Sequence, residues 1–326
     1  MSVLWGLLAL AGLLGGANVA IRRGLAAPRV VETGSPQGLP WRAVEVPTVN
    51  GKRLFGWFIP AGERAPALVV MHGWGGNAEM MLPLAAPLHE RGYVLLLVDA
   101  RCHGQSDDDT FASLPRFAED IEAAVDWLAG QPEVDAARLG VIGHSVGAGA
   151  ALLAASRRRD LRAVVSLAAF AHPAGMMRRW LASKRIPHWP FGAYILAYVQ
   201  RVIGYRFDDI APCHTIARVA CPVLLVHGDQ DATDEPQPQR KIRAGLHPDG
   251  GRADHDGRHP GGQHHRRHEA DPDGQLQGHQ IEQGLRPKAR AHTQRATQPP
   301  AQAGIEATLL AASRTWSATW RPTSAS

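Results

Sequence analysis

The segment Gly143-His144-Ser145-Val146-Gly147 has the G-x-S-x-G spacing of a nucleophilic serine. It follows the apolar run Leu139–Ile142 and opens a helical pattern rich in small residues at 146–155. In this context a tight strand-to-helix turn lifts the serine hydroxyl above the sheet, and the glycines let the backbone pass closely. The helix N-terminus then stabilises negative charge that develops beside the serine. We therefore predict that Ser145 is a nucleophile for acyl transfer.

The elements that must position Ser145 alternate between strands and helices. Short continuous apolar runs that end at polar or small residues are typical of buried parallel strands. The predicted strands are two within Val44–Ile59, joined at Asn50-Gly51, and one each at Ala67–Met71, Tyr93–Val98, Leu139–Ile142, Ala163–Leu167 and Val223–Val226, with helical patterns at 77–91, 116–129 and 146–156. This alternation predicts an α/β fold with a mostly parallel central sheet and helices on both faces. Ligands bind such sheets beyond the carboxyl ends of the strands.

Three further segments follow predicted strands and carry a family resemblance. They are His72-Gly73-Trp74-Gly75-Gly76-Asn77, the stretch DARCHGQSD from Asp99 to Asp107, and His227-Gly228-Asp229-Gln230-Asp231. With the serine segment they resemble the motifs of the α/β-hydrolase family, in the family's order, over roughly residues 44–235. The resemblance implies an oxyanion hole made by the backbone N–H groups of Trp74 and Val146. It implies a triad acid at Asp231, with Asp229 as the alternative, because only position in the motif separates them.

The resemblance also implies a catalytic histidine on a turn after one more strand. Beyond the acid, however, the chain reads LHPDGGRADHDGRHPGG and contains no apolar run. His255 lies 24 residues after Asp231 and is our candidate for the base. The resemblance implies the catalytic histidine roughly 25–35 residues after the acid. Eight of the 16 histidines follow Leu246, so some histidine close to that spacing is expected in any case.

No metal or organic cofactor is expected for this chemistry. The three cysteines, Cys102, Cys213 and Cys221, lack metal-site spacing and cannot form a dense disulfide scaffold. We expect His72 and His103 to brace loops, because they flank turns and do not occupy the expected acid–base position.

The stretch 241–326 differs in composition from the rest of the chain. It has 12 Lys+Arg against 8 Asp+Glu, which accounts for +4 of the formal net charge of +5, and the last Val is Val226. We predict a disordered His/Arg/Gln/Pro-rich tail, because such a segment has little to bury. A frame shift between Thr233 and Leu246 is our hypothesis for the change; a native tail that binds metal or RNA is the alternative. Because the basic excess lies in this tail, we expect no nucleic-acid partner for the main domain.

The N-terminus carries an uncharged run from Val3 to Ile21, followed by Arg22 and Arg23. About 20 apolar residues span a bilayer, and positive charges favour the cytoplasmic side. We predict a single-pass membrane anchor at 1–23 with a cytoplasmic catalytic domain; a cleaved signal peptide is the alternative. Residues 24–43 are predicted as a linker and 44–240 as the hydrolase domain.

Residues 171–218 interrupt the strand–helix alternation and contain many Met and aromatic side chains. This composition indicates a helical lid over a pocket, or plain helix packing. We expect the protein to be a serine hydrolase that cleaves a small-molecule carboxylic ester through an acyl-enzyme. The alternatives are a peptidase or amidase of the same fold, and an inactive hydrolase-like protein that lacks the last strand and the histidine base.

Overall fold

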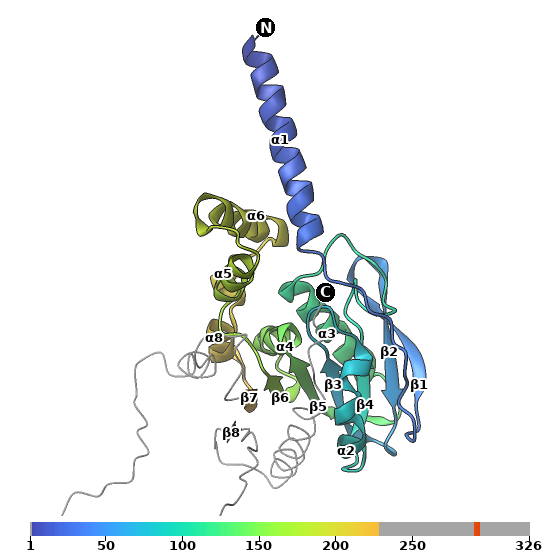
Figure 1. Ribbon diagram of the computed structural model, residues 1–326. Coiled ribbons are helices and arrows are strands. Elements are labelled where there is room, and N and C mark those ends of the chain that lie inside the picture. Colours follow the sequence, from blue (N-terminus) through green and yellow to red (C-terminus); the bar gives the residue numbers. More distant parts are fainter. Residues whose placement is uncertain (1, 228–289, 294–326) are drawn as a thin grey trace, which may run out of the picture.

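A central eight-stranded sheet organises the protein, in the order β1-β2-β4-β3-β5-β6-β7-β8 (Figure 1). The structure, a computed structural model, describes residues 2–227 and 290–293. The strands are β1 (Arg42–Thr48), β2 (Lys52–Ile59), β3 (Ala65–Met71), β4 (Val94–Val98), β5 (Val134–His144), β6 (Leu161–Leu167), β7 (Val223–His227) and β8 (Arg290–Thr293). Pairings from β4 through β3, β5 and β6 to β7 are parallel, and the pairings of β1, β2 and β8 are antiparallel. The predicted α/β class and mostly parallel sheet are confirmed.

The hairpin at the sheet edge forms where the sequence predicts it. Asn50 and Gly51 have φ values of 63° and 64°, within a 3-10 turn, η1 (Val49–Gly51), between β1 and β2. Asparagine and glycine tolerate positive φ better than other residues, which explains the position of the turn.

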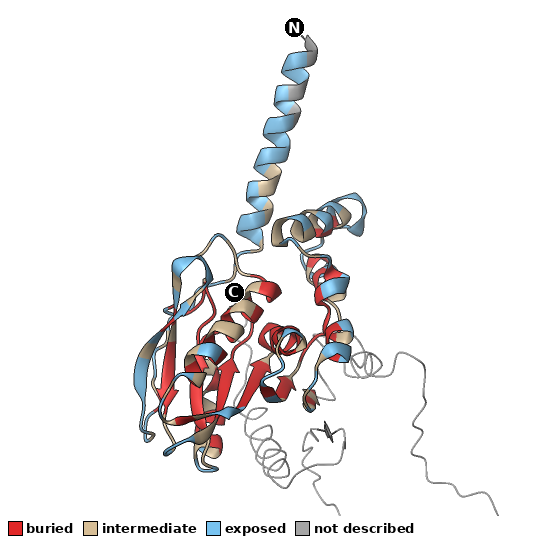
Figure 2. Ribbon diagram, turned by 180° about the vertical axis from the view of Figure 1, so that it is seen from behind, coloured by how far each residue is buried: buried red, intermediate tan, exposed pale blue. Residues whose placement is uncertain are grey.

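Two hydrophobic clusters cover the two faces of the sheet. Successive residues alternate between them: Val69 packs with helices α3 (Leu114–Ala129) and α4 (Val146–Arg157), and Val70 packs with the opposite cluster. That second cluster includes a 3-10 helix, η2 (Ala78–Leu84), which continues into α2 (Ala85–His89). Figure 2 shows the central strands and the facing sides of these helices buried. Helices on both faces are therefore confirmed, and the core fixes the strand ends that carry the site.

The segment 171–218 is helical, as predicted, and leaves the sheet between β6 and β7 (Figure 1). We call it the helical insertion. Its elements are α5 (Pro173–Ser183), the π-helix η3 (His188–Gly192), α6 (Ala193–Ile203), α7 (Phe207–Ile210), α8 (Pro212–Thr215) and the 3-10 helix η4 (Ile216–Arg218).

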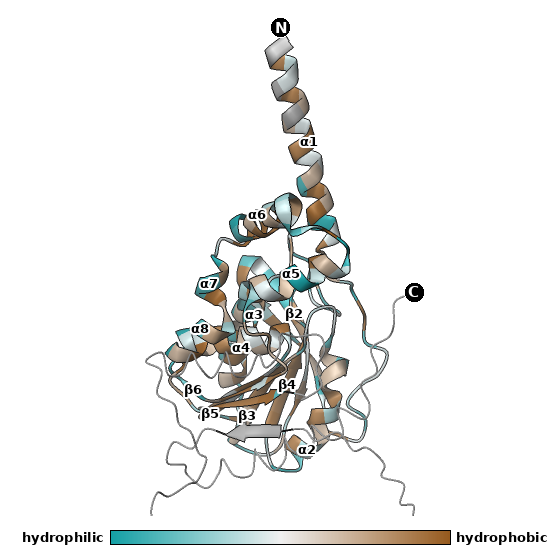
Figure 3. Ribbon diagram, turned by 60° about the vertical axis from the view of Figure 1, so that its left-hand side comes forward, coloured by the Kyte–Doolittle hydropathy of each residue, from teal (hydrophilic) through white to brown (hydrophobic). Residues whose placement is uncertain are grey.

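The N-terminal run forms one continuous helix, α1 (Ser2–Gly24), which extends away from the domain (Figures 1 and 3). The window Leu4–Gly24 has a mean hydropathy of 1.8, and none of it is buried within the protein. The helix is long and apolar enough to cross a membrane as an anchor or to serve as a signal sequence.

The predicted tail at 241–326 lies outside the described residues except for β8. The composition of the tail predicts no strand, yet Arg290–Thr293 pairs antiparallel with β7. A ladder of backbone hydrogen bonds needs no apolar side chains, so hydrophobic patterning does not reveal such a strand. Asp229, Asp231 and His255 also lie outside the described residues.

Candidate active site

Ser145 stands at the turn between β5 and α4 in a strained backbone conformation. Its φ and ψ are 53° and −113°, a combination that L-residues with a Cβ atom rarely adopt. Its backbone N–H donates to the carbonyl oxygen of Leu167 at the end of β6, with an N···O distance of 2.8 Å. The residue is half-buried, and within the described part of the chain no group makes a hydrogen bond to its hydroxyl. The turn therefore holds the hydroxyl of Ser145 without a hydrogen bond to any group in the described part of the chain.

The two glycines of the motif are required by close backbone packing. A Cβ atom at Gly143 would collide with the backbone of Gly147, and one at Gly147 would collide with the carbonyl oxygen of His72. The first turn of α4 thus presses against both β5 and the end of β3. The spacing of the motif follows from this contact.

The loop after β3 lies directly beside Ser145. A Cβ atom at Gly73 would stand 3.1 Å from the Cβ atom of Ser145, so the two backbones approach within side-chain contact. Val146 is the first residue of α4, and its N–H therefore has no acceptor within the helix. In residues 2–227 and 290–293, no backbone oxygen accepts a hydrogen bond from the N–H of Trp74. The predicted oxyanion donors thus lie on the loop after β3 and at the start of α4, which meet at Ser145.

The ring of His72 ties these loops together. Its Nε2 accepts a hydrogen bond from the N–H of Ala100 at 3.0 Å, so its Nδ1 carries the proton and donates to the carbonyl oxygen of Gly73 at 2.6 Å. Complete burial, followed by the neighbouring His103, lowers the pKa of His72 to about 3. The ring is therefore neutral at physiological pH and has both nitrogens engaged, which suits bracing and not proton transfer.

A buried arginine organises the loop after β4. The guanidinium of Arg101 is 1% exposed and pairs with Asp120 at 2.7 Å, Glu119 at 2.6 Å and Asp109 at 3.1 Å. The backbone N–H of Arg101 also donates to the carboxylate of Asp120 at 2.9 Å. This arrangement holds the segment 99–107 against α3, and the same segment supplies the contact to His72 through Ala100. Arg101 belongs to the DARCHGQSD motif, but its partners on α3 carry no sequence signal.

Residues 28–33, which we call the N-terminal strap, lie over the two site loops. Arg29 donates to the carbonyl oxygens of Gly104 and Ser106, each at 2.9 Å, and Asn77 Nδ2 donates to the carbonyl oxygen of Val30 at 3.1 Å. The segment predicted as a linker therefore makes specific contacts with the domain. Through them α1 is connected to the loop that carries the candidate oxyanion donor Trp74.

The strap brings the carboxyl group of Glu32 against that of Asp99. Asp99 is fully buried and accepts the N–H groups of Ala78 at 2.7 Å and Gln105 at 2.8 Å. Burial, followed by hydrogen bonding and charge repulsion from Glu32, raises the pKa of Asp99 to about 8. A proton on Asp99 lets the two carboxyl groups share a hydrogen bond. No sequence pattern indicates this pair, because the two residues are far apart along the chain.

We expect the substitution Glu32→Gln to stabilise the protein at pH 8 by about 1 kcal/mol, equivalent to a shift of roughly one pKa unit. Because the folded pKa of Asp99 is about 8 and its ordinary value is 3.8, the folded state holds a proton between these pH values that the unfolded chain releases. Stability therefore falls as pH rises from about 4 to about 8. Removing the charge of Glu32 lowers the pKa of Asp99, so the free energy of unfolding decreases less between pH 5 and pH 8. Urea unfolding at pH 5 and pH 8 measures it.

The matched control for this prediction is Glu63→Gln, since Glu63 is exposed and makes no hydrogen bond within the described residues. Its slope between pH 5 and pH 8 should equal that of the unchanged protein. An unchanged slope for Glu32→Gln would show that the two carboxyl groups are not coupled.

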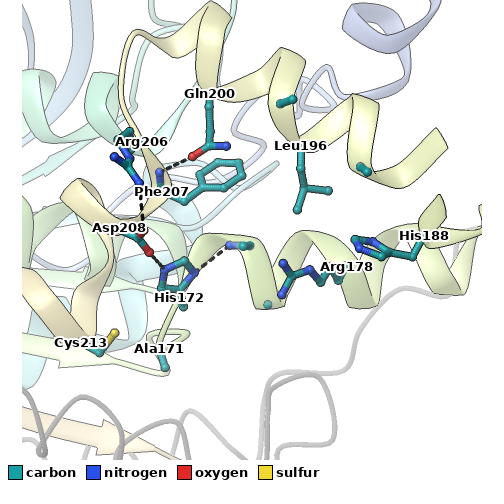
Figure 4. Close-up of a pocket in the computed structure, with 14 residues that line it drawn as sticks. Ala171, His172, Arg178, His188, Leu196, Gln200, Arg206, Phe207, Asp208 and Cys213 are labelled. Atoms are coloured by element: carbon teal, nitrogen blue, oxygen red, sulfur yellow. Dashed lines mark hydrogen bonds and ion pairs between the residues drawn. The ribbon is translucent and has the colours of Figure 1, made fainter. Parts of the chain in front are cut away.

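A pocket of about 750 Å³ lies between α5, α6 and the start of α7, within the helical insertion (Figure 4). His172, Asp208 and His214 meet near it, with one ligand atom from each within 4.8 Å of the others. His172 Nδ1 accepts the N–H of Ala174 at 3.2 Å, so its Nε2 carries the proton and donates to Asp208 at 2.8 Å. A metal would need the lone pair of that nitrogen. The group therefore fits a hydrogen-bonded His–Asp pair better than a metal site.

Of the predicted site residues, the structure brings together Ser145, Trp74 and Val146. It does not place Asp231 or His255, which lie outside the described residues.

Comparison with known proteins finds similarity to a family of hydrolases. Residues 62–202 match the family described as "Serine aminopeptidase, S33". Uncharacterized protein Rv2307c of Mycobacterium tuberculosis is 33% identical over 196 residues, which are 58% of this chain and 62% of that protein. Polyketide transferase GrgF from a Penicillium species is 32% identical over 133 residues, which are 40% of this chain and 45% of that protein. The chain thus spans less than two thirds of these relatives.

Solved structures share the fold. The esterase Pf2001 of Pyrococcus furiosus superposes with a TM-score of 0.55 at 24% identity and covers 68% of this chain and 84% of its own. The crystal structure of GrgF superposes with a TM-score of 0.51 at 20% identity and covers 64% of this chain and 86% of its own. At these identities the likeness establishes the fold, and the chemistry rests on the site itself.

Proposed function

From the α/β-hydrolase fold of this chain and the match of residues 62–202 to a serine aminopeptidase family, we propose that the protein is a serine hydrolase that cleaves carboxylic esters through an acyl-enzyme. The observation that carries the proposal is the strained conformation of Ser145, at φ 53°, beside the N–H groups of Trp74 and Val146, which have no backbone acceptor among residues 2–227 and 290–293. Strain of this kind persists where the surrounding structure enforces it, and it is concentrated at functional sites.

In the proposed mechanism Ser145 Oγ attacks the ester carbonyl carbon while a histidine base takes its proton. The carbonyl oxygen becomes an oxyanion, which the N–H groups of Trp74 and Val146 stabilise together with the N-terminus of α4. The alcohol leaves with the proton from the histidine, and an acyl group remains on Ser145. Water then attacks this ester by the same route in reverse and releases the acid.

We assign the acid to Asp231, as the family resemblance implies, and the base that it orients to His255, our candidate by its spacing of 24 residues after Asp231. The acid would hold the imidazole in the required tautomer and stabilise its protonated form. The proposal requires no cofactor. A small-molecule ester is the proposed substrate, in keeping with the likeness to an esterase; amide hydrolysis is the alternative, in keeping with the aminopeptidase family description.

We also propose that α1 anchors the protein in a membrane, with the catalytic domain on the cytoplasmic side. The helix is continuous over 23 residues, and Arg22 and Arg23 lie in its last turn, next to the domain. Positive charge at that end favours a cytoplasmic location of the residues that follow.

The test of the enzymatic proposal is covalent labelling of the full-length protein with a fluorophosphonate, combined with turnover of a short p-nitrophenyl ester. We expect one label, located on Ser145 by peptide mass spectrometry, and loss of turnover in proportion to labelling. Ser156, whose hydroxyl already donates to the carbonyl oxygen of Leu153 at 2.7 Å, serves as the internal control and should stay unlabelled. Folded protein that neither reacts nor turns over ester would establish the inactive alternative instead.

A further inference from the structure

The helical insertion exposes a group of large aromatic side chains. Trp189 is 79% exposed, Phe191 is 62% exposed and Tyr194 is 41% exposed. All three belong to η3 and the start of α6, and they are close together along the chain. A folded protein seldom leaves neighbouring rings of this size in water unless they meet a partner.

The helix that follows them, α6, leaves one face uncovered. Leu196 is buried, and Ile195, Val199 and Ile203 pack against the core with partial burial. Tyr194, Ala197 and Arg201 are three and four residues apart and are exposed, so they form the uncovered face of the helix.

Contacts with α1 place α6 beside the C-terminal end of this apolar helix. Tyr198 OH accepts a hydrogen bond from Arg22 Nε at 2.8 Å, and Tyr194 OH donates to Asn18 Oδ1 at 2.9 Å. Figures 1 and 3 show α6 at the end of the domain from which α1 emerges. When α1 crosses a bilayer, the aromatic residues of the insertion therefore stand at the level of its surface.

The insertion is also strongly basic. Between residues 171 and 218 it has seven Lys+Arg and two Asp+Glu, a surplus that equals the formal net charge of +5 for the whole chain. Arg178, Lys184, Arg185 and Arg201 are exposed, and none makes an ion pair within the described residues. These charges flank the exposed aromatic group on both sides in the sequence.

From these observations we propose that the exposed face of η3 and α6, flanked by basic residues, docks on the surface of an anionic phospholipid bilayer. Tryptophan and tyrosine favour the headgroup region, where an apolar ring and a polar tip are both satisfied. Basic residues near an anionic surface each contribute attraction worth about fivefold in affinity. The insertion then forms a second membrane contact beside α1, and it orients the domain relative to the bilayer.

This inference rests on the proposed anchoring of α1 in a membrane but not on ester hydrolysis, so its test can fail or succeed independently of the proposed enzymatic activity. We would measure hydrogen–deuterium exchange of the full-length chain in nanodiscs of phosphatidylcholine, in nanodiscs that also contain phosphatidylglycerol, and in detergent. We expect the amides of residues 186–195 to exchange about tenfold more slowly in the anionic discs than in the neutral discs or detergent. Peptides from β3 and α4 should exchange equally in all three and so verify the fold.

Matched variants separate the contributions of charge and of the rings. Reversing two charges, in Lys184→Glu with Arg185→Glu, should reduce the difference between anionic and neutral discs to less than about twofold. Replacing the rings, in Trp189→Ser with Phe191→Ser, should expose residues 186–195 to exchange in every disc. Arg159→Glu is the control, because Arg159 is exposed and follows the far end of α4.

Two outcomes would overturn the proposal. Equal exchange of residues 186–195 in anionic discs, neutral discs and detergent would show that this face has no lipid partner. Protection in detergent that increases with protein concentration would assign the surface to a second copy of the chain.

Discussion

Replacing Ser145 with alanine is expected to lower ester turnover at least about 10⁴-fold, because the acyl-enzyme cannot form without the hydroxyl. The proposed oxyanion donors, the N–H groups of Trp74 and Val146, remain in this variant. Weak catalysis above the rate in water should therefore persist. Initial rates with a p-nitrophenyl ester measure the effect. Binding of a non-hydrolysable substrate analogue should change little, since the side chain loses a single oxygen atom.

A second variant, Ser145→Gly, tests whether the turn is strained. Both variants remove the nucleophile, but glycine has no Cβ atom to penalise φ 53°. We therefore expect Ser145→Gly to be more stable to urea than Ser145→Ala by about 1–2 kcal/mol. Equal stability would contradict a strained turn, whereas retained turnover in either variant would contradict the assignment of the nucleophile.

Replacing Arg101 with methionine is expected to reduce the free energy of unfolding by about 3–5 kcal/mol, because it leaves buried carboxylates without their counter-charge. Asp120 and Arg101 are each 1% exposed at the side chain, so water does not compensate the loss. Urea unfolding at neutral pH measures it. Ester turnover should fall as well, since Arg101 holds the segment that contacts His72 through Ala100.

The pH dependence of this variant distinguishes an electrostatic loss from a packing loss. Burial raises the pKa of Asp120 to about 6 even though Arg101 opposes the change. Without Arg101 the folded pKa rises further above the ordinary value of 3.8, and stability falls with increasing pH across a wider window. The destabilisation should therefore be larger at pH 8 than at pH 5. A loss that is the same at both would indicate packing alone.

The control for Arg101 is Arg53→Met. Arg53 also pairs with carboxylates, Glu45 at 2.8 Å and Asp107 at 3.8 Å, but its side chain is 60% exposed. Exposed pairs of this kind contribute about 0–1 kcal/mol. The contrast between the two arginines isolates the effect of burial.

Local signals in the sequence predicted most of the architecture. Apolar runs identify β3, β4, β6 and β7 to within two residues at either end, and Asn50-Gly51 locates the hairpin. The sequence alone did not predict that β5 begins as early as Val134, because residues 135–138 are exposed or half-buried and form no apolar run. Nor did it predict β8, which pairs through its backbone.

The candidate site likewise has a part that the sequence predicts and a part that only the tertiary structure reveals. The sequence by itself determined Ser145 and its two glycines, because a tight turn between a strand and a helix imposes residue types at fixed spacing. Only the tertiary structure decided that Glu32 contacts Asp99 and that Arg101 pairs with carboxylates of α3. The same holds for the contact between α6 and the C-terminal end of α1. Each of these contacts joins residues from separate elements through a few polar atoms. Such contacts leave no periodic pattern, since they depend on how finished elements pack and not on how any one of them folds.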